Sequence, residues 1–416
     1  MSGLRPHLGE AAWLTAGSLP HILEILDRDG EEARVVGGAV RNALIGQPVH
    51  EIDIATTALP EEIIRRAQAA HLRTVPTGID HGTITLLADG VPFEVTTLRE
   101  DVETYGRKAK VAFGRDWRRD AERRDFTMNA LSVSRDGVVH DYVGGLADLD
   151  ARRVRFIGDA NQRIAEDYLR ILRFFRFHAA YGEGEPDPAA LHACIAARDG
   201  LGALSRERVR MEMLKLLVAR RAFGAIRVMS ETGLLVTILG GVPYLMACEK
   251  MVAIEAAIGE RPDAIRRLGA LAVSVEEDGA RLFERLRLSN AEYDRLRGMA
   301  DGWWRIDAGL APQDARALLY RLGAAEFADR LLLGWSRSQD APDDSRWRDL
   351  LALPARWQPP SCPIAAADLI ARGLPKGPAL GAALREAEAK WIAADFPADP
   401  AVVAAIADQA VAKHRA

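Results

Sequence analysis

Cysteine is scarce in this 416-residue chain, and its scarcity excludes two classes of protein. The three cysteines, Cys194, Cys248 and Cys362, are odd in number and lack the close spacing of a metal-binding motif. A disulfide-stapled secreted fold and a cysteine-based zinc site are therefore excluded. We expect three free thiols in the reducing environment of the cytoplasm.

Long hydrophobic runs are missing as well. The longest apolar stretch, Gly233–Cys248, is interrupted by Gly240, Gly241 and Pro243 and is too short to span a bilayer. No N-terminal stretch combines basic residues, an apolar run and a small-residue cleavage site. We therefore expect neither a secretory signal nor an association with membranes.

An overall excess of basic residues is also absent. The formal net charge is −4 and the pI is about 6.2, which by itself disfavours a nucleic-acid-binding protein. The local distribution differs, because residues 107–124 hold eight Lys/Arg against three Asp/Glu and residues 152–176 hold seven against three. Such basic segments suit a phosphate-rich partner such as RNA or a triphosphate, although ordinary solvated surfaces would carry the same charges.

A compact motif stands in residues 35–56, VVGGAVRNALIGQPVHEIDIAT. An apolar strand leads into a double glycine and a helix, whose N-terminus favours an anion such as phosphate. A second apolar strand then carries Glu51 and Asp53, two positions apart and so on one face of a strand. Paired carboxylates repel each other unless a hard cation such as Mg²⁺ lies between them. The motif predicts a metal-assisted phosphoryl or nucleotidyl transfer site.

The same residues resemble a known family. GGAVRN…EIDIAT is similar to the first motif of the bacterial CCA-adding tRNA nucleotidyltransferases and the related bacterial poly(A) polymerases, the class II nucleotidyltransferases. The similarity continues through RRDFTMNAL, DYVGGLADL, EDYLRILRFFRFHAA and SRERVRMEMLKLL, which covers the first 217 residues, and a weaker echo follows in DLIARGLPKGPALG. Asn42 and Glu51 stand where the family usually has aspartate. The extra methylene of Glu51 moves its carboxylate by about an ångström, a shift that matters for catalysis.

The resemblance implies an activity and a set of site residues. The reaction would be template-independent transfer of CMP and AMP from CTP and ATP to the 3′ end of tRNA, with release of pyrophosphate. Glu51 and Asp53 would be the catalytic residues and would hold Mg²⁺ as the cofactor. The residues assigned to the triphosphate and ribose are Gly38, Arg41, Arg124 and Asp125. Two alternatives stay open: a poly(A) polymerase that uses ATP alone, and a non-catalytic RNA-binding relative, which Glu51 suggests.

Arg123 and Arg124 directly precede a segment that we predict to be a strand. Two adjacent residues on a strand cannot face the same site, so one arginine is expected to contact the triphosphate. The resemblance points to Arg124. A surface ion pair between Arg123 and Asp125 is the structural alternative.

Residues 161–180 are predicted to form one amphipathic helix. Successive residues of a helix are rotated by about 100°, so one face of this helix would carry Glu166, Arg170, Arg173 and Phe177. Asp167 and Arg176 would lie on opposite sides of that face. Cytosine and adenine both present an amino donor beside a ring-nitrogen acceptor, whereas uracil and guanine present the reverse. We predict that Asp167 and Arg170 read the incoming base through that difference, and that Arg173 and Arg176 also contact the nucleotide. A solvated face on a structural helix is the alternative.

These patterns predict an α+β fold in four parts. A small mixed-sheet nucleotidyltransferase head (residues 1–150) precedes an all-helical neck with the nucleotide-recognition helix (151–220), a helical body (221–350) and a helical, tRNA-binding tail (351–416). We expect strands at residues 34–36, 51–54, 83–88, 93–98 and 131–133, helices at 19–27 and 60–70, and a mobile loop at 99–117. Glu94 is either a third carboxylate near the metal or a solvated acid on an edge strand.

Overall fold

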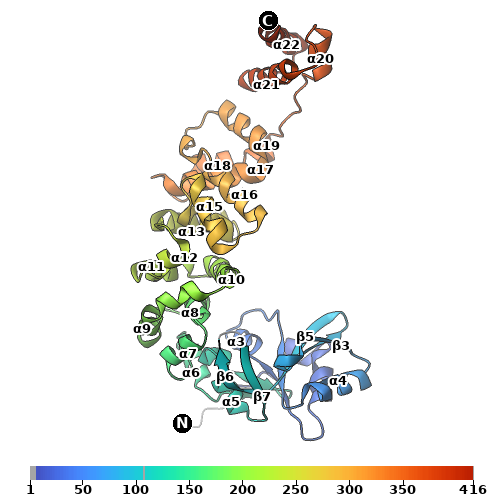
Figure 1. Cartoon of the computed structure of the whole chain (residues 1–416), viewed down its shortest axis with the longest axis vertical. Coiled ribbons are helices and arrows are strands. Elements are labelled where there is room, and N and C mark those ends of the chain that lie inside the picture. The colour runs from blue at the N-terminus through green and yellow to red at the C-terminus, as the bar shows by residue number, and fades with distance from the viewer. Residues whose placement is uncertain (1–5, 106–107, 416) are drawn as a thin grey trace. The chain divides into compact units, whose positions relative to one another are not determined.

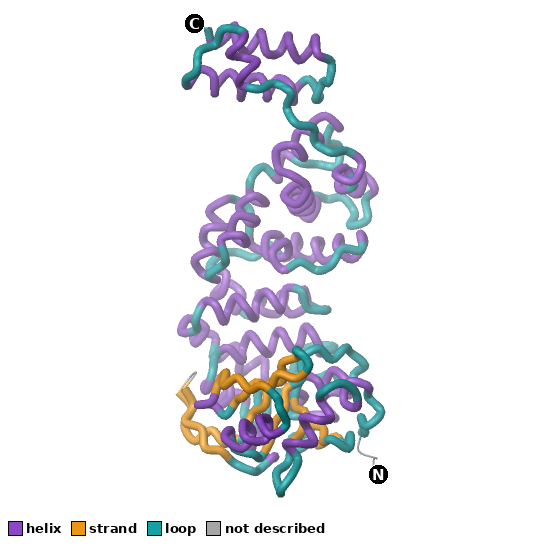
Figure 2. Tube along the Cα trace, turned by 90° about the vertical axis from the view of Figure 1, so that its right-hand side faces the viewer, coloured by secondary structure: helices purple, strands orange, loops and turns teal. Residues whose placement is uncertain are grey.

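The computed structural model describes residues 6–105 and 108–415 (Figure 1). The chain divides into two compact units, Met1–Ile238 and Leu239–Ala416, and each is described by itself. In Figure 2 the strands are confined to the head, and the rest of the chain is helical. The predicted α+β class is confirmed.

The head is built on a seven-stranded sheet with the order β3-β4-β5-β2-β1-β8-β9. The strands are β1 Ala33–Val36, β2 Asp53–Thr56, β3 Arg73–Gly78, β4 Thr83–Ala88, β5 Val91–Thr97, β8 Ser132–Ser134 and β9 Val139–His140. β2 and β5 run parallel, and the other neighbours are antiparallel, so the sheet is mixed as predicted. Its central strands place Val35, Ile54 and Val95 in the core, where they are fully buried.

Helices pack on this sheet where their sequences favour them. α4 (Pro60–Ala69) starts with proline in its first turn, followed by Glu61 and Glu62, which complement the helix dipole, and it packs on β3, β4 and β5. α2 (Leu19–Leu26) packs on β1. Both helices confirm the predicted ones. The remaining head elements are α1 Ala12–Thr15, α3 Gly38–Leu44, α6 Gly145–Asp150 and the short 3₁₀ turns η1 Ile79–His81 and η2 Thr127–Asn129.

The loop predicted at residues 99–117 is wrong. β6 (Arg99–Tyr105) and β7 (Lys108–Phe113) form an antiparallel hairpin, and α5 (Trp117–Glu122) follows with Asp116 as its N-cap (Figure 1). Backbone pairing between two polar segments stabilises this hairpin, and a composition-based reading does not detect such pairing. Residues 106–107 of the predicted loop lie outside the described residues.

The single helix predicted at residues 161–180 is also wrong. The chain forms α7 (Ala160–Glu166) and α8 (Leu169–Tyr181), separated by Asp167 in an extended conformation with φ −157° and ψ 106°. Asp167 Oδ1 accepts a hydrogen bond from the backbone N–H of Leu169, so this side chain satisfies a donor at the start of α8. The unit continues with α9 Pro188–Ala196, η3 Arg198–Ala203, α10 Arg206–Leu217 and α11 Ala222–Glu231.

Aromatic packing joins the neck helix α8 to the head. The ring of Phe126 lies 4.9 Å from Phe156, 6.5 Å from Phe174 and 5.1 Å from Phe177, measured between centroids. Phe126 and Phe174 are fully buried. Because such aromatic pairs add to the energy of burial, this cluster holds the charged residues of α8 in place relative to the head.

The second unit is entirely helical in its described residues. Its elements, starting with the helix that crosses the unit boundary, are α12 Leu234–Leu239, α13 Leu245–Ile258, α14 Ala264–Ala272, α15 Glu276–Leu286, α16 Asn290–Ala300, η4 Trp303–Arg305, α17 Pro312–Arg337, α18 Ser345–Leu351, α19 Leu353–Arg356, α20 Ala366–Ala371, α21 Pro378–Ala393 and α22 Pro400–His414. Gly323, with φ 72°, breaks α17: Tyr320 before it packs on Trp391, and Trp335 after it stacks on Trp347 at 5.8 Å. Among the described residues, no helix combines the length and the apolar character that crossing a bilayer requires.

Candidate active site

Carboxylates gather at the start of strand β2. The parallel register places Asp53 directly opposite Glu94 of β5, and on its other side Asp53 pairs with Val36 of β1. Glu51 precedes the strand, so the prediction that it lies on β2 together with Asp53 is wrong. Its charge still acts on Asp53: burial, Glu94 and Glu51 raise the pKa of Asp53, and Arg124 opposes the shift. Asp53 therefore stands among negative charges that a cation would compensate.

The carboxylates fit a divalent ion that is shared with a substrate. No group of three or more His, Cys, Asp or Glu side chains arranged to hold a metal occurs in residues 6–105 and 108–415. Mg²⁺ commonly takes only one or two protein carboxylates and completes its coordination with water and substrate phosphates. A cation bound there would relieve the repulsion among Asp53, Glu94 and Glu51. Substrate phosphates would provide the remaining ligands.

The double glycine forms the turn that the motif predicts. Gly37 has φ 70° and ψ −120°, a conformation that favours glycine, and it is the N-cap residue of α3. A Cβ at position 37 would lie 3.5 Å from Arg124 Nη1, and a Cβ at Gly38 would lie 3.6 Å from Arg41 Nη2. The turn therefore brings together both arginines that the sequence assigns to the triphosphate.

Arg41 is a buried residue with 6% exposure. Its guanidinium donates to the Asn42 and Asn129 side-chain oxygens and, at 2.7 Å, to the Tyr181 hydroxyl. The Tyr181 ring also lies 4.0 Å from Cζ. In this structure Arg41 is thus bound to protein groups, and it links the glycine turn to helix α8.

Arg123 and Arg124 follow helix α5 and do not precede a strand directly, because η2 intervenes before β8. Both contact the same acid: Asp120 accepts from Arg123 Nη2 at 2.6 Å and from Arg124 Nη2 at 3.2 Å. Asp120 is 3% exposed, and although its burial acts to raise its pKa, the two arginines hold it low. Both arginines thus contact one buried acid, and the prediction that one of them contacts the triphosphate stays a prediction. The i, i+3 and i, i+4 spacing was the sequence signal for Asp120.

Asp125 pairs with the neck helix and not with Arg123. Its carboxylate lies 2.5 Å from Arg173 Nη2 and accepts from the Asn129 amide at 3.1 Å. Burial acts to raise the pKa of Asp125, but Arg173 and the hydrogen bonds to the carboxylate lower it overall. Buried Glu212 of α10 similarly binds Arg176 Nε at 2.5 Å. Sequence analysis missed Glu212, because its partner lies 36 positions away in the chain.

The two residues predicted to read the base each have a protein partner. Asp167 lies 2.5 Å from Arg208 Nη2 of α10, and Arg170 of α8 pairs with Glu166, the last residue of α7. Arg170 also donates to the Arg163 carbonyl at 2.7 Å. Asp167 contributes to the negative field around Arg173, so these charged groups form one connected network beside the head.

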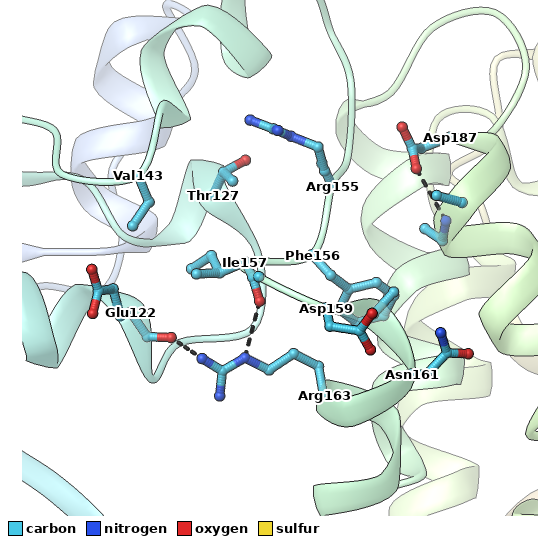
Figure 3. Close-up of a pocket in the computed structure, with 14 residues that line it drawn as sticks. Glu122, Thr127, Val143, Arg155, Phe156, Ile157, Asp159, Asn161, Arg163 and Asp187 are labelled. Carbon is cyan, nitrogen blue, oxygen red and sulfur yellow. Dashed lines mark hydrogen bonds between the residues drawn. The ribbon is translucent and has the colours of Figure 1, made fainter.

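A cavity of about 710 Å³ opens between the end of α5, α7 and the start of α9 (Figure 3). Arg163 crosses it and donates to the carbonyls of Ile157 and Glu122. None of the residues predicted for the site lines this cavity. This cavity is therefore separate from the carboxylates and arginines at the glycine turn.

Comparison with known proteins identifies the class. Residues 33–155 match the poly A polymerase head domain, and residues 185–248 match a domain described as a probable RNA and SrmB-binding site of polymerase A. The fold is that of a nucleotidyltransferase. Enzymes of this class are generally dependent on a divalent metal ion.

The relatives narrow the class to one family. The chain is 33% identical over 393 residues to the mitochondrial CCA tRNA nucleotidyltransferase 1 of Homo sapiens, which covers 90% of this chain and 86% of that protein. It is 44% identical over 224 residues to the Danio rerio protein of the same name, which covers 53% of this chain and 52% of that protein, about half of its length. This protein belongs to the CCA tRNA nucleotidyltransferase family, and the resemblance drawn from its motifs is confirmed.

Solved structures agree with this assignment. The Bacillus stearothermophilus CCA-adding enzyme in complex with CTP superimposes with a TM-score of 0.74 at 26% identity, over 95% of this chain and 98% of that chain. The Thermotoga maritima CCA-adding enzyme complexed with tRNA_CCA gives a TM-score of 0.68 at 19% identity, over 95% and 94%, which supports the fold alone.

Proposed function

We propose that this protein completes the 3′ end of tRNA, transferring CMP and AMP from CTP and ATP and releasing pyrophosphate. The observation that carries the proposal is the opposition of Asp53 and Glu94 beside Arg124 at the glycine turn, in a chain of this family. Paired carboxylates and a nearby cation are what an attacking hydroxyl and a leaving polyphosphate require.

The metal would be Mg²⁺, held by Glu51 and Asp53 as catalytic residues, with Glu94 as a third acid. When bound, Mg²⁺ makes the 3′-hydroxyl more acidic and stabilises the charge of the leaving pyrophosphate. Asp53 and Glu94 would orient the 3′ end of the tRNA from one side. The residues that would hold the triphosphate and ribose from the other side are Gly38, Arg41, Arg124 and Asp125.

Selection of the base would come from the neck. Asp167 would accept from the amino group of cytosine or adenine, and Arg170 would donate to the neighbouring ring nitrogen. Asp167 lies in extended backbone between two helices, and its Oδ2 atom, which now accepts from Arg208, is the atom that would accept from the base while Oδ1 keeps its bond to the Leu169 N–H. Arg173 and Arg176 would complete the nucleotide site.

The helical second half would bind tRNA through shape and phosphate contacts, with little reading of bases. The division into head (1–150), neck (151–220), body (221–350) and tail (351–416) belongs to this proposal. We also place the protein in the cytoplasm. Its three cysteines are free, and burial raises the pKa of Cys194 and Cys248, as expected for unreactive structural thiols.

A poly(A) polymerase is the second candidate, because the head matches the domain of that name. The test incubates the protein with tRNA that lacks its CCA end and with each labelled nucleoside triphosphate in turn. Stepwise incorporation of CMP and then AMP supports the proposal. AMP tailing of unrelated RNA supports the polymerase, and RNA binding without incorporation identifies a non-catalytic relative.

A further inference from the structure

Arg41 is a buried cation whose direct partners are all neutral. Its Nε and Nη2 donate to Asn42 Oδ1 at 3.2 and 3.0 Å, and its other bonds go to Asn129 and Tyr181. By contrast, Arg124, Arg173 and Arg176 each contact a carboxylate. In the part of the chain that the structure describes, no carboxylate forms an ion pair with Arg41.

The surroundings compensate the charge of Arg41 only in part. Asn129 connects Arg41 to Asp125, since its amide donates to Asp125 Oδ1 at 3.1 Å. Asp125, however, already pairs with Arg173 at 2.5 Å. Asp125 attracts Arg41 and Arg176 repels it, so these two longer-range effects oppose each other. A buried cation without an ion-pair partner of its own is costly, so Arg41 gains more than its neighbours from an incoming anion.

The residue at position 42 decides whether Arg41 has a charged partner. The Asn42 oxygen receives hydrogen bonds from both Nε and Nη2 of Arg41. A carboxylate in the same place would form a bidentate ion pair with the guanidinium, the strongest arrangement that these groups make. The amide of Asn42 accepts the same hydrogen bonds from Arg41 but carries no negative charge.

We infer that Asn42 sets how tightly this enzyme holds the polyphosphate of its substrate. Because the amide leaves Arg41 without a counter-charge, the guanidinium is assigned to a phosphate of the nucleoside triphosphate or of the pyrophosphate product. Gly38 leaves this side of the guanidinium uncovered, since a Cβ at Gly38 would lie 3.6 Å from Arg41 Nη2. This inference rests on the proposed function and assigns one determinant of its substrate affinity.

The test is Asn42→Asp, which changes the charge at nearly constant shape. Affinity for metal-free inorganic pyrophosphate, measured by calorimetry, should fall by roughly ten- to a hundredfold, the effect of one unit charge at short range. The KM for CTP should rise by a similar factor, with a smaller change in kcat. The melting temperature should rise, because the buried guanidinium gains an ion pair.

Two controls separate charge from structure. Asn290→Asp adds the same charge at an exposed position of α16 and should leave pyrophosphate affinity unchanged. Asn42→Ala loses the same bond to the Pro48 carbonyl as Asn42→Asp but adds no charge, so its affinity should fall less. Equal losses in both Asn42 variants, or unchanged affinity in Asn42→Asp, would overturn the inference. A wild-type protein that does not extend tRNA would instead overturn the proposed function.

Discussion

Asp53 and Glu94 occupy the same register position on two parallel neighbouring strands, β2 and β5. Neighbours in register point to the same face of a sheet, so the two carboxylates act on each other. Together with burial, this raises the pKa of Asp53. The pair is the centre of the proposed metal site, and the first two predictions follow from it.

Replacing Asp53 by Asn should reduce nucleotide transfer by roughly a thousandfold or more, since a lost metal ligand removes several kcal/mol of transition-state stabilisation. The fold should become more stable at neutral pH. A carboxyl whose pKa is raised in the folded state contributes full stability below its unfolded pKa and loses it as pH rises through the folded pKa. Melting curves from pH 3 to 7 should therefore show that the melting temperature of the variant, relative to that of wild type, increases with pH. Added Mg²⁺ should raise the melting temperature of wild type and not of the variant.

Changing Glu94 to Gln should lower transfer by roughly a hundredfold, because it removes the acid opposite Asp53. Glu61→Gln on the exposed first turn of α4 makes the same chemical change away from the site and serves as the control. Single-turnover incorporation of CMP measures both variants. Equal activity of the two would leave Glu94 as a solvated acid without a part in the metal site.

Shortening Glu51 to Asp should retain or increase activity, because the family usually has aspartate at this position. Glu51→Ala should lower activity, since the carboxylate contributes to the charge around Asp53. The measurement is CMP incorporation as a function of Mg²⁺ concentration. A Glu51→Ala variant with the metal dependence of wild type would remove Glu51 from the metal site.

Removing the Asp167 side chain should reduce the preference for CTP and ATP over UTP and GTP by roughly ten- to a hundredfold, the range of one bidentate base contact. Incorporation of each nucleotide singly, by wild type and Asp167→Ala, measures it. Asp159→Ala removes an exposed acid at the start of α7 and controls for charge. If the Asp167→Ala enzyme is slower but equally selective, Asp167 has only a structural role, through its contacts with Arg208 and Leu169.

Local patterns in the sequence predicted much of this protein. Apolar alternation placed the central strands to within a few residues, and proline followed by two acids placed the start of α4. Ser289 is followed three positions later by Glu292, and in the structure the two residues form a capping box. The glycine turn and Asp53 were also recognisable. These features depend on residues a few positions apart, whose preferences are set by backbone geometry.

Tertiary structure alone decided which charges far apart in the sequence meet. Glu94 comes to lie opposite Asp53 only through parallel pairing of strands that are 41 positions apart, and that register has no local signal. Asp167 interrupts a pattern that is helical by periodicity, and its carboxylate meets Arg208 on another helix, also 41 positions away. Asp125 and Glu212 likewise reach Arg173 and Arg176 across the fold. Side-chain periodicity shows which face a charge occupies, whereas its partner depends on how separate elements pack.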